Sequence, residues 1–174
     1  MGFWAAMDEI YPTTRQQRCW QHKTMNVLNC LPKLSQPKAK AAIHDIWQAE
    51  TKDDAIKAFD LFIKTYEAKY PKATLCLQKD REELMAFFDF PAQHWQSIRT
   101  SNPIESAFAT IRHRTKRSKG CLSRDGMLHM MFKLGQCAEQ NWRKLRGFDY
   151  LAKVITGVTF KDGIEATKPD QIAA

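Results

Sequence analysis

A mainly α-helical fold is predicted by three observations on this sequence of 174 residues. Hydrophobic residues make up 44% of the chain, which is a globular composition with enough apolar side chains for an ordinary core. Apolar residues between positions 35 and 90 recur at helical spacing. Prolines and capping residues stand where these helices would begin.

The N-terminal region predicts two helices separated by a short extended piece. A first helix, ending at Pro12, is indicated by four apolar residues at helical spacing, Phe3, Trp4, Met7 and Ile10. Residues 14–20 are compatible with a short strand, and the pattern becomes helical again over residues 21–31.

Residues 35–90 predict a helical block. Ser35 precedes a helix with Pro37 in its first turn, and Thr51 with Asp54 opens the next in the manner of a capping box. Pro71 restarts the chain, and one or two further helices follow. The helix after Thr51 has a clear apolar stripe, formed by Ala55, Phe59, Phe62, Ile63, Tyr66 and Tyr70.

A linking segment from Pro91 is expected to lead to a helix that starts at Pro103. Asn102 is a favoured N-cap residue and Glu105 follows at the third helical position, so N-x-x-E forms a capping box. One face of this helix is expected to anchor it to a core, through Ile104, Phe108 and Ile111.

A polar loop through residues 119–120 and a further helix over residues 124–145 complete the prediction. The tail after Gly157 has few large apolar residues and is expected to fray. The inner side of the 124–145 helix is expected to consist of Met127, Met130, Met131, Leu134 and Ala138.

The net charge of +8 is concentrated in residues 99–146, which hold 11 basic and three acidic residues. A focused basic block of this kind is typical of a DNA- or RNA-binding protein, although a solvated helical face would look the same. The residues expected to contact phosphates are Arg99, Arg112, Arg114, Lys116, Arg117, Lys119 and Arg124.

Several classes of protein are excluded by what the sequence lacks. It contains no run of about 18 apolar residues for a membrane span and no signal peptide at its N-terminus. Its five cysteines are odd in number and widely spaced, which favours reduced thiols in a cytosolic protein. Cys19-x-x-His22 has no second Cys/His pair to complete a zinc finger, and nothing marks Cys19 as a nucleophile.

Glu105 has two interpretations on local sequence alone. It caps its helix, or it is one of three carboxylates that hold two divalent metal ions in an enzyme that cuts and joins DNA strands. A Glu near a helix start, followed by bases that grip phosphates, is compatible with both.

The chain resembles Mutator-type bacterial insertion-sequence transposases over residues 2–154. The resemblance rests on the G-F-W opening, the C-x-x-H element and T-S-N-P-I-E-S followed by the basic run. It implies a ribonuclease H-like core with an Asp-Asp-Glu triad that binds Mg²⁺ or Mn²⁺, in which Glu105 would be the catalytic glutamate. Cys19, His22 and Asn102 would support the active site, and the DNA ends of the transposon would be the partner. The protein would work in the bacterial cytoplasm at the nucleoid, with no membrane contact.

Both family aspartates lie upstream of G-F-W, so the resemblance predicts a C-terminal fragment with the central sheet largely missing. Its parts would be a core remnant with the C-x-x-H motif, an all-helical insertion, the core helices with Glu105, and a flexible tail, over residues 1–34, 35–95, 96–156 and 157–174. With an incomplete metal site, the fragment is expected to bind no metal stably and to be inactive alone. The alternative is a DNA-binding regulatory fragment that interferes with intact transposase subunits.

Overall fold

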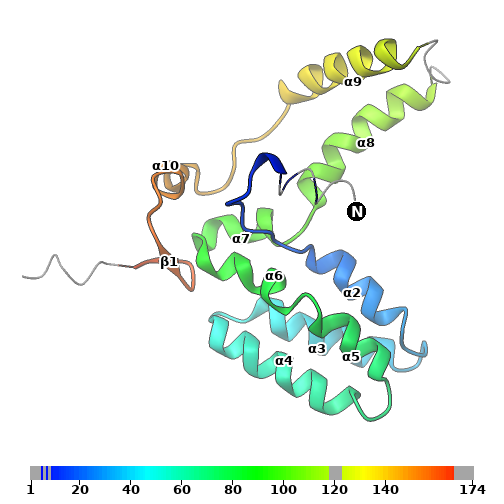
Figure 1. Cartoon of the computed structure of the whole chain (residues 1–174), viewed down its shortest axis with the longest axis vertical. Helices are drawn as coiled ribbons and strands as arrows, with labels where there is room; N and C mark the ends of the chain where they lie inside the picture. Colours follow the sequence, from blue (N-terminus) through cyan, green and yellow to red (C-terminus); the bar gives the residue numbers. More distant parts are fainter. Residues whose placement is uncertain (1–4, 6, 8, 118–122, 167–174) are drawn as a thin grey trace, which may run out of the picture.

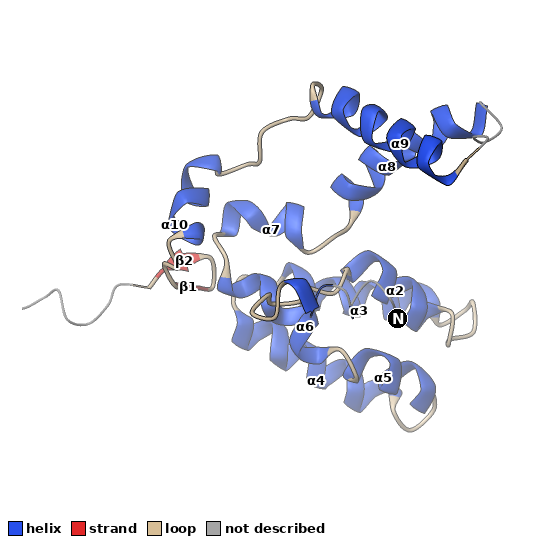
Figure 2. Ribbon diagram, turned by 45° about the horizontal axis from the view of Figure 1, so that its top comes forward, coloured by secondary structure: helices blue, strands red, loops and turns tan. Residues whose placement is uncertain are grey.

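The computed structural model of the protein describes residues 5, 7, 9–117 and 123–166, and these are mainly helical, as predicted (Figures 1 and 2). Two 3₁₀ helices, η1 (Ala86–Asp89) and η2 (Phe148–Tyr150), and a two-stranded antiparallel sheet of β1 (Phe160–Lys161) and β2 (Ile164–Glu165) accompany the α-helices. None of the described helices is long and apolar enough to cross a membrane. The α-helices are α2 (Trp20–Leu28), α3 (Gln36–Gln48), α4 (Lys52–Tyr66), α5 (Pro71–Gln78), α6 (Arg81–Met85), α7 (Ala92–Ile98), α8 (Asn102–Arg117), α9 (Arg124–Glu139) and α10 (Leu151–Ile155).

Helices α2 to α7 enclose one hydrophobic core, which we call the helical body. The capping box at Thr51 is confirmed, since its Oγ1 accepts a hydrogen bond of 3.2 Å from the Asp54 amide. The predicted α4 stripe is confirmed as well: three of its residues are buried and three pack partly against the core. The largest apolar side chains that are fully buried are Trp20, Ile43, Ile46, Phe59, Phe62, Phe87 and Phe88.

One ion pair lies inside the helical body. The Lys23 side chain is fully buried, and its ammonium forms an ion pair with Asp80 and donates 2.9 Å to the carbonyl of Cys76. Arg18 Nε lies 3.3 Å from the same carboxylate. A buried ammonium needs such partners because leaving water costs several kcal/mol for each ion, on the order of magnitude found in proteins. This pair joins α2 to the start of α6.

The strand predicted over residues 14–20 is wrong. Residues 14–19 are extended but pair with helix ends, where the Arg18 amide donates 2.9 Å to the carbonyl of Glu83. No neighbouring strand is described there, so the segment cannot form a sheet. The next helix begins at Trp20 and ends at Leu28, three residues earlier than predicted.

Of the helix predicted before Pro12, the described residues Met7 and Ile10 are helical, while Phe3 and Trp4 lie outside the described residues.

The segment from Pro91, predicted as a linker, contains helix α7. Trp95 packs edge-on against Phe87 and Phe88, with ring centroids 5.3 and 5.0 Å apart, and its Nε1 donates 2.8 Å to the carbonyl of Phe90. His94 is buried on the same helix. These tertiary contacts stabilise a helix of seven residues that would be marginal in isolation.

Helices α8 and α9 run alongside each other and project away from the helical body (Figure 1). The Glu105 amide donates 2.9 Å to the carbonyl of Ser101, so Ser101 is the N-cap residue. The predicted N-cap, Asn102, is instead the first helical residue. Helix α9 ends at Glu139, short of the predicted Leu145, and the predicted loop at 119–120 lies outside the described residues.

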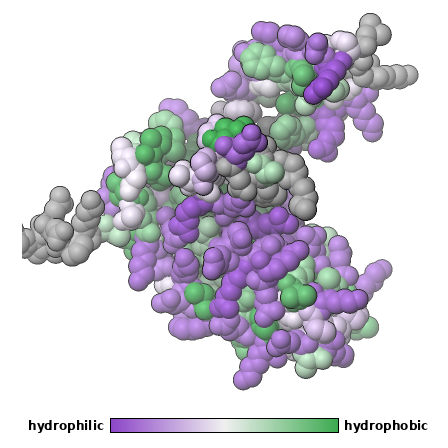
Figure 3. Space-filling model, in the orientation of Figure 1, coloured by the Kyte–Doolittle hydropathy of each residue, from purple (hydrophilic) through white to green (hydrophobic). Residues whose placement is uncertain are grey.

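The apolar faces predicted to be buried on these two helices are mostly exposed. Ile104 is 61% exposed and Phe108 is 49% exposed, while Ala138 is the buried member of the predicted α9 set. The prediction is wrong because α8 and α9 contact each other but no third layer among the described residues covers them. Figure 3 shows hydrophobic residues on the surface of this hairpin.

The predicted fraying of the tail after Gly157 is also wrong as far as Ala166, and residues 167–174 lie outside the described residues. The β1–β2 turn docks on the helical body, where the Ala92 amide donates 3.1 Å to the carbonyl of Gly163. A side chain at Gly163 would meet the Cβ of Ala92 at 2.6 Å, and its φ of +80° favours glycine.

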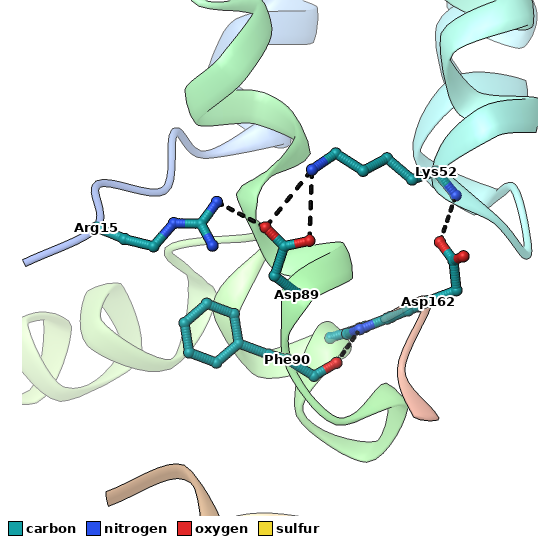
Figure 4. Close-up of polar contacts among 6 residues, drawn as sticks. Arg15, Lys52, Asp89, Phe90 and Asp162 are labelled. Carbon is teal, nitrogen blue, oxygen red and sulfur yellow. Dashed lines mark hydrogen bonds and ion pairs between the residues drawn. The ribbon is translucent and has the colours of Figure 1, made fainter. Parts of the chain in front are cut away.

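Charged groups hold the same turn (Figure 4). Asp162 Oδ1 accepts 2.7 Å from the Lys52 amide, and Lys52 Nζ lies 3.3 Å from Asp89, which Arg15 contacts at 2.6 Å. The hairpin therefore belongs to the packed structure.

We predict that Asp80→Ala lowers the free energy of unfolding by about 3–5 kcal/mol, because it leaves the Lys23 ammonium buried and unpaired. Urea unfolding followed by circular dichroism measures this change. Lys23→Met with Asp80→Ala should recover most of the loss. Asp60→Ala, which removes the exposed partner of Arg81, should cost less than about 1 kcal/mol. Equal losses for Asp80→Ala and Asp60→Ala would contradict the assignment.

Candidate functional site

Ser101 brings together the two motifs that the sequence singled out. Its Oγ lies 3.2 Å from His22 Nδ1 and 3.3 Å from Cys19 Sγ, and it also hydrogen-bonds Glu105 Oε1. The C-x-x-H element at the start of α2 and Glu105 in the first turn of α8 therefore form one cluster, although they are far apart in the sequence. We call Cys19, His22, Ser101 and Glu105 the Ser101 cluster.

The Ser101 hydroxyl has a single proton, so the hydrogen bonds of the cluster depend on one another. When this proton goes to Glu105 Oε1, the hydroxyl accepts from His22 Nδ1–H. His22 Nε2 then lies 3.4 Å from Glu105 Oε1 and forms an ion pair when the ring is protonated. The cluster therefore couples the orientation of the Glu105 carboxylate to the proton on His22.

Glu105 does not use its carboxylate as the predicted capping box requires. Its Oε1 contacts Ser101 and His22 instead of the Asn102 backbone, and its Oε2 has no hydrogen bond to a described residue. The side chain is 53% exposed and borders an open pocket of about 680 Å³, which Asn102 and Arg112 also line. One carboxylate oxygen is thus available on the surface beside two groups that bind anions or phosphate oxygens.

The Cys19 thiol is perturbed by the same cluster. Partial burial raises its pKa, but hydrogen bonds from the Ser101 hydroxyl, from the His22 and Ser101 amides and from the His22 ring stabilise the thiolate more strongly. The net effect is a pKa below the ordinary value of 9.0. Cys19, Cys30, Cys76 and Cys137 are all free thiols, and Cys121 lies outside the described residues.

The described residues do not supply a complete metal site. No group of three or more His, Cys, Asp or Glu side chains among them is arranged to hold a metal ion. A pair of divalent ions needs several carboxylates, and Glu105 has no second one beside it in the part of the chain that the structure describes. Residues from elsewhere would have to complete such a site.

The predicted DNA-contacting residues fall into two groups. The first lies on the α8–α9 hairpin, is exposed, and has no ion-pair partner among the described residues; its members are Arg112, Arg114, Lys116, Arg117 and Arg124. Lys119 lies outside the described residues. Arg99 differs, because its guanidinium lies 4.6 Å from the ring centroid of Trp47 and donates 2.8 Å to the Trp47 carbonyl. Burial lowers the pKa of Arg99.

Sequence reasoning missed two features of this region. Ser101 stands in the T-S-N-P-I-E-S motif and is a preferred N-cap type, which was the available signal. The second is the loop Arg143–Arg146, whose basic residues lie beside Arg99 in a pocket of about 910 Å³. Their position depends on contacts that the sequence pattern does not reveal.

Comparison with known proteins identifies relatives of this chain. The family described as "Transposase, Mutator family" matches residues 1–144. The transposase for insertion sequence element IST2 of Acidithiobacillus ferrooxidans is 56% identical over 98% of this chain and 58% of its own length. The transposase for IS6120 of Mycolicibacterium smegmatis is 44% identical over 99% of this chain and 53% of its own length. The transposase for IS905 of Lactococcus lactis is 30% identical over 67% of this chain and 29% of its own length. The chain therefore spans a little over half the length of the first two relatives.

We predict that the rate of Cys19 alkylation by iodoacetamide reaches half its maximum below pH 9.0, because the thiolate reacts and the cluster lowers its pKa. Mass spectrometry of the Cys19 peptide measures the rate at each pH. Ser101→Ala should move this midpoint up, and His22→Gln should move it by less. A midpoint that Ser101→Ala leaves unchanged would contradict the proposed hydrogen bonding.

Proposed function

Because the chain belongs to the Mutator family of transposases, we propose that it carries Glu105 and a DNA-binding surface for metal-dependent cleavage and transfer of DNA strands. The observation that best supports this proposal is the Ser101 cluster, in which the C-x-x-H element contacts the glutamate of N-P-I-E-S. A capping role alone gives no reason for His22 to lie 3.4 Å from the Glu105 carboxylate.

In this proposal the fold is that of an Asp-Asp-Glu transposase with a ribonuclease H-like core. The helical body would be the all-helical insertion together with the element that carries Cys19 and His22. Among the described residues the β1–β2 hairpin is the sheet, so the central sheet of such a core is not part of the described structure. The mainly helical content and the length of the helical body are compatible with an insertion.

Glu105 would serve as one carboxylate ligand of Mg²⁺ or Mn²⁺. Its Oε1 is held by Ser101, while Oε2 stays available beside Arg112 in the open pocket. The described residues lack the further carboxylates that two ions need, so this chain is not expected to cleave DNA by itself.

The α8–α9 hairpin would hold the DNA. Its five exposed cations, which have no ion-pair partners among the described residues, can neutralise backbone phosphates without reading the sequence. In the intact family enzyme this DNA would be the ends of the transposon.

A regulatory role is the second candidate, favoured by the exposed apolar face of the hairpin, which could contact a transposase subunit. Both candidate roles include DNA binding, and they differ in whether Glu105 takes part in chemistry.

We predict that Glu105→Gln abolishes cleavage of transposon ends in a chimera, in which this chain replaces the matching part of the IST2 transposase. The change keeps the size of the side chain but removes the charge that binds a metal. Cleavage of a labelled end fragment with Mg²⁺ or Mn²⁺ is the measurement. Glu82→Gln, an exposed acid on α6, is the control and should remain active. If Glu105→Gln cleaves as fast as the chimera, Glu105 is not catalytic.

We predict that this chain binds duplex DNA with an affinity that falls steeply with salt. Replacing Arg112, Arg114, Lys116 and Arg117 with Ala should reduce the slope of log K against log salt by about 3 to 4, at about 0.9 for each phosphate contact. Fluorescence anisotropy at several salt concentrations measures the slope. The matched control replaces four exposed lysines of the helical body, Lys38, Lys40, Lys64 and Lys72. Equal changes in both variants would mean that the hairpin charge is a solvated face.

A further inference from the structure

The pocket beside Arg99 has the lining of an anion site. It measures about 910 Å³ and lies between α7, the start of α8 and the loop Arg143–Arg146, which supplies three cations. No Asp or Glu side chain lines it, and none of its four cations has an ion-pair partner among the described residues. Four neighbouring positive charges without an acid are unfavourable unless water or an anionic ligand offsets their repulsion.

The loop that carries these cations is fixed in place by the helical body. The carbonyl of Gly147 lies 3.0 Å from Nε2 of His94, whose side chain is buried, and Arg146 donates 2.9 Å to Gln96. Gly147 has a φ of +67°, and an added Cβ would meet the Cβ of Gln93 at 2.6 Å, so the loop lies directly against α7. The pocket is therefore a built wall of the structure and not a chance gathering of surface arginines.

Arg99 forms the inner side of the pocket. Its guanidinium carries five N–H groups, and one hydrogen bond, to the carbonyl of Trp47, is made with a described residue. The planar group is held over the Trp47 ring, which fixes its orientation before a ligand arrives. An Arg held in this way is suited to a phosphate, because its remaining donors can bind two oxygens at once.

The same pocket offers groups that suit a nucleobase. Gln21, Gln96 and Asn102 line it, and each amide has both a donor and an acceptor for the edge of a base. The volume is near the upper end of the range for ligand pockets, about 300–1,000 Å³. A duplex shows its base edges only in its grooves, whereas an unpaired nucleotide can place both phosphate and base in such a recess.

The pocket also adjoins the Ser101 cluster. Asn102 lines both this pocket and the one that Glu105 and Arg112 border. Gln21 and His22 are neighbours on α2 and belong one to each pocket. A DNA strand that passes Glu105 would therefore reach the Arg99 pocket with its adjacent nucleotides.

We propose that the pocket formed by Arg99 and the loop Arg143–Arg146 binds an unpaired nucleotide of the DNA strand that passes Glu105. The proposal rests on the proposed function for the identity of the ligand as DNA, and it adds a site that prefers single strands. Phosphate oxygens meet Arg99, Arg143 and Arg146, and the base meets the amides of the opposite wall.

The test measures binding of fluorescein-labelled oligothymidylate and of a labelled hairpin duplex to the full chain by fluorescence anisotropy. The loop variant, Arg143→Ala with Lys144→Ala and Arg146→Ala, changes three exposed side chains outside helices and strands. We expect it to bind oligothymidylate at least about tenfold more weakly. The salt slope should fall by about 2, at about 0.7 for each single-strand phosphate contact. Duplex binding should stay within about twofold because the cations of α8 are unchanged.

The matched control removes three charges far from the pocket, with Lys38→Ala, Lys40→Ala and Lys64→Ala. We expect it to bind oligothymidylate as the parent does. Equal losses in the loop variant and in this control would overturn the proposal, since they would reflect general electrostatics. Equal losses of single-strand and duplex binding in the loop variant would overturn it as well, since the pocket would then not select unpaired DNA.

A second measurement places the nucleotide. An oligothymidylate carrying 5-iodouracil, irradiated in complex with the chain, should crosslink to Trp47 or to residues 143–146. Crosslinks confined to α8 would overturn the proposal while leaving the proposed DNA binding intact. If the parent binds neither oligothymidylate nor duplex, the DNA-binding part of the proposed function fails together with this inference.

Discussion

The hydrogen bond of 2.9 Å from the Trp20 amide to the carbonyl of Arg99 is the constraint on which the candidate site depends. It joins the first residue of α2 to the turn between α7 and α8, so that Cys19 and Ser101 meet on either side of it. Trp20 cannot shift, because its side chain is fully buried and its Nε1 donates 2.8 Å to the carbonyl of Leu84. Arg99 is held in turn by Trp47. The helical body thus fixes the distance between the C-x-x-H element and Glu105, which neither α2 nor α8 determines alone.

The sequence predicted the elements whose signals are local. Helix α4 has a capping residue at Thr51 and a stripe ending near Tyr66, and both signals act within one helix. The elements that were missed depend on distant contacts: α7 is stabilised by Trp95 on Phe87, and the C-terminal turn by the Ala92–Gly163 hydrogen bond. For the candidate site, Cys19, His22 and Glu105 were predicted by a family motif, whereas Ser101 and the loop Arg143–Arg146 acquire their roles only through tertiary packing.

The α8–α9 hairpin has two surfaces of different chemistry. Glu105 and Arg112 border the open polar pocket, whereas Ile104 and Phe108 line an apolar groove of about 750 Å³ with Trp142. Exposed apolar area costs roughly 25 cal/mol for each Å² that could be buried, so this groove favours a covering layer. An uncovered face is what the sequence predicted for a helix separated from its partner sheet. The relatives, which are nearly twice as long as the matched region, contain further chain that could provide such a layer.

Electrostatics distinguishes the two interpretations of Glu105. The carboxylate lies between Arg112 and the pocket of four cations, on a surface that is otherwise suited to phosphates. Two like charges 4 Å apart repel by about 4 kcal/mol at an effective dielectric constant of 20, so an acid placed here weakens DNA binding unless a cation joins it to the phosphate. Helix capping does not require this acid, because Ser101 already occupies the N-cap position. A divalent cation bound by the available Oε2 would turn the repulsion into attraction, and only then would the acid and the basic surface act on the same DNA strand. This balance of charges supports the proposed metal role of Glu105 over a capping role.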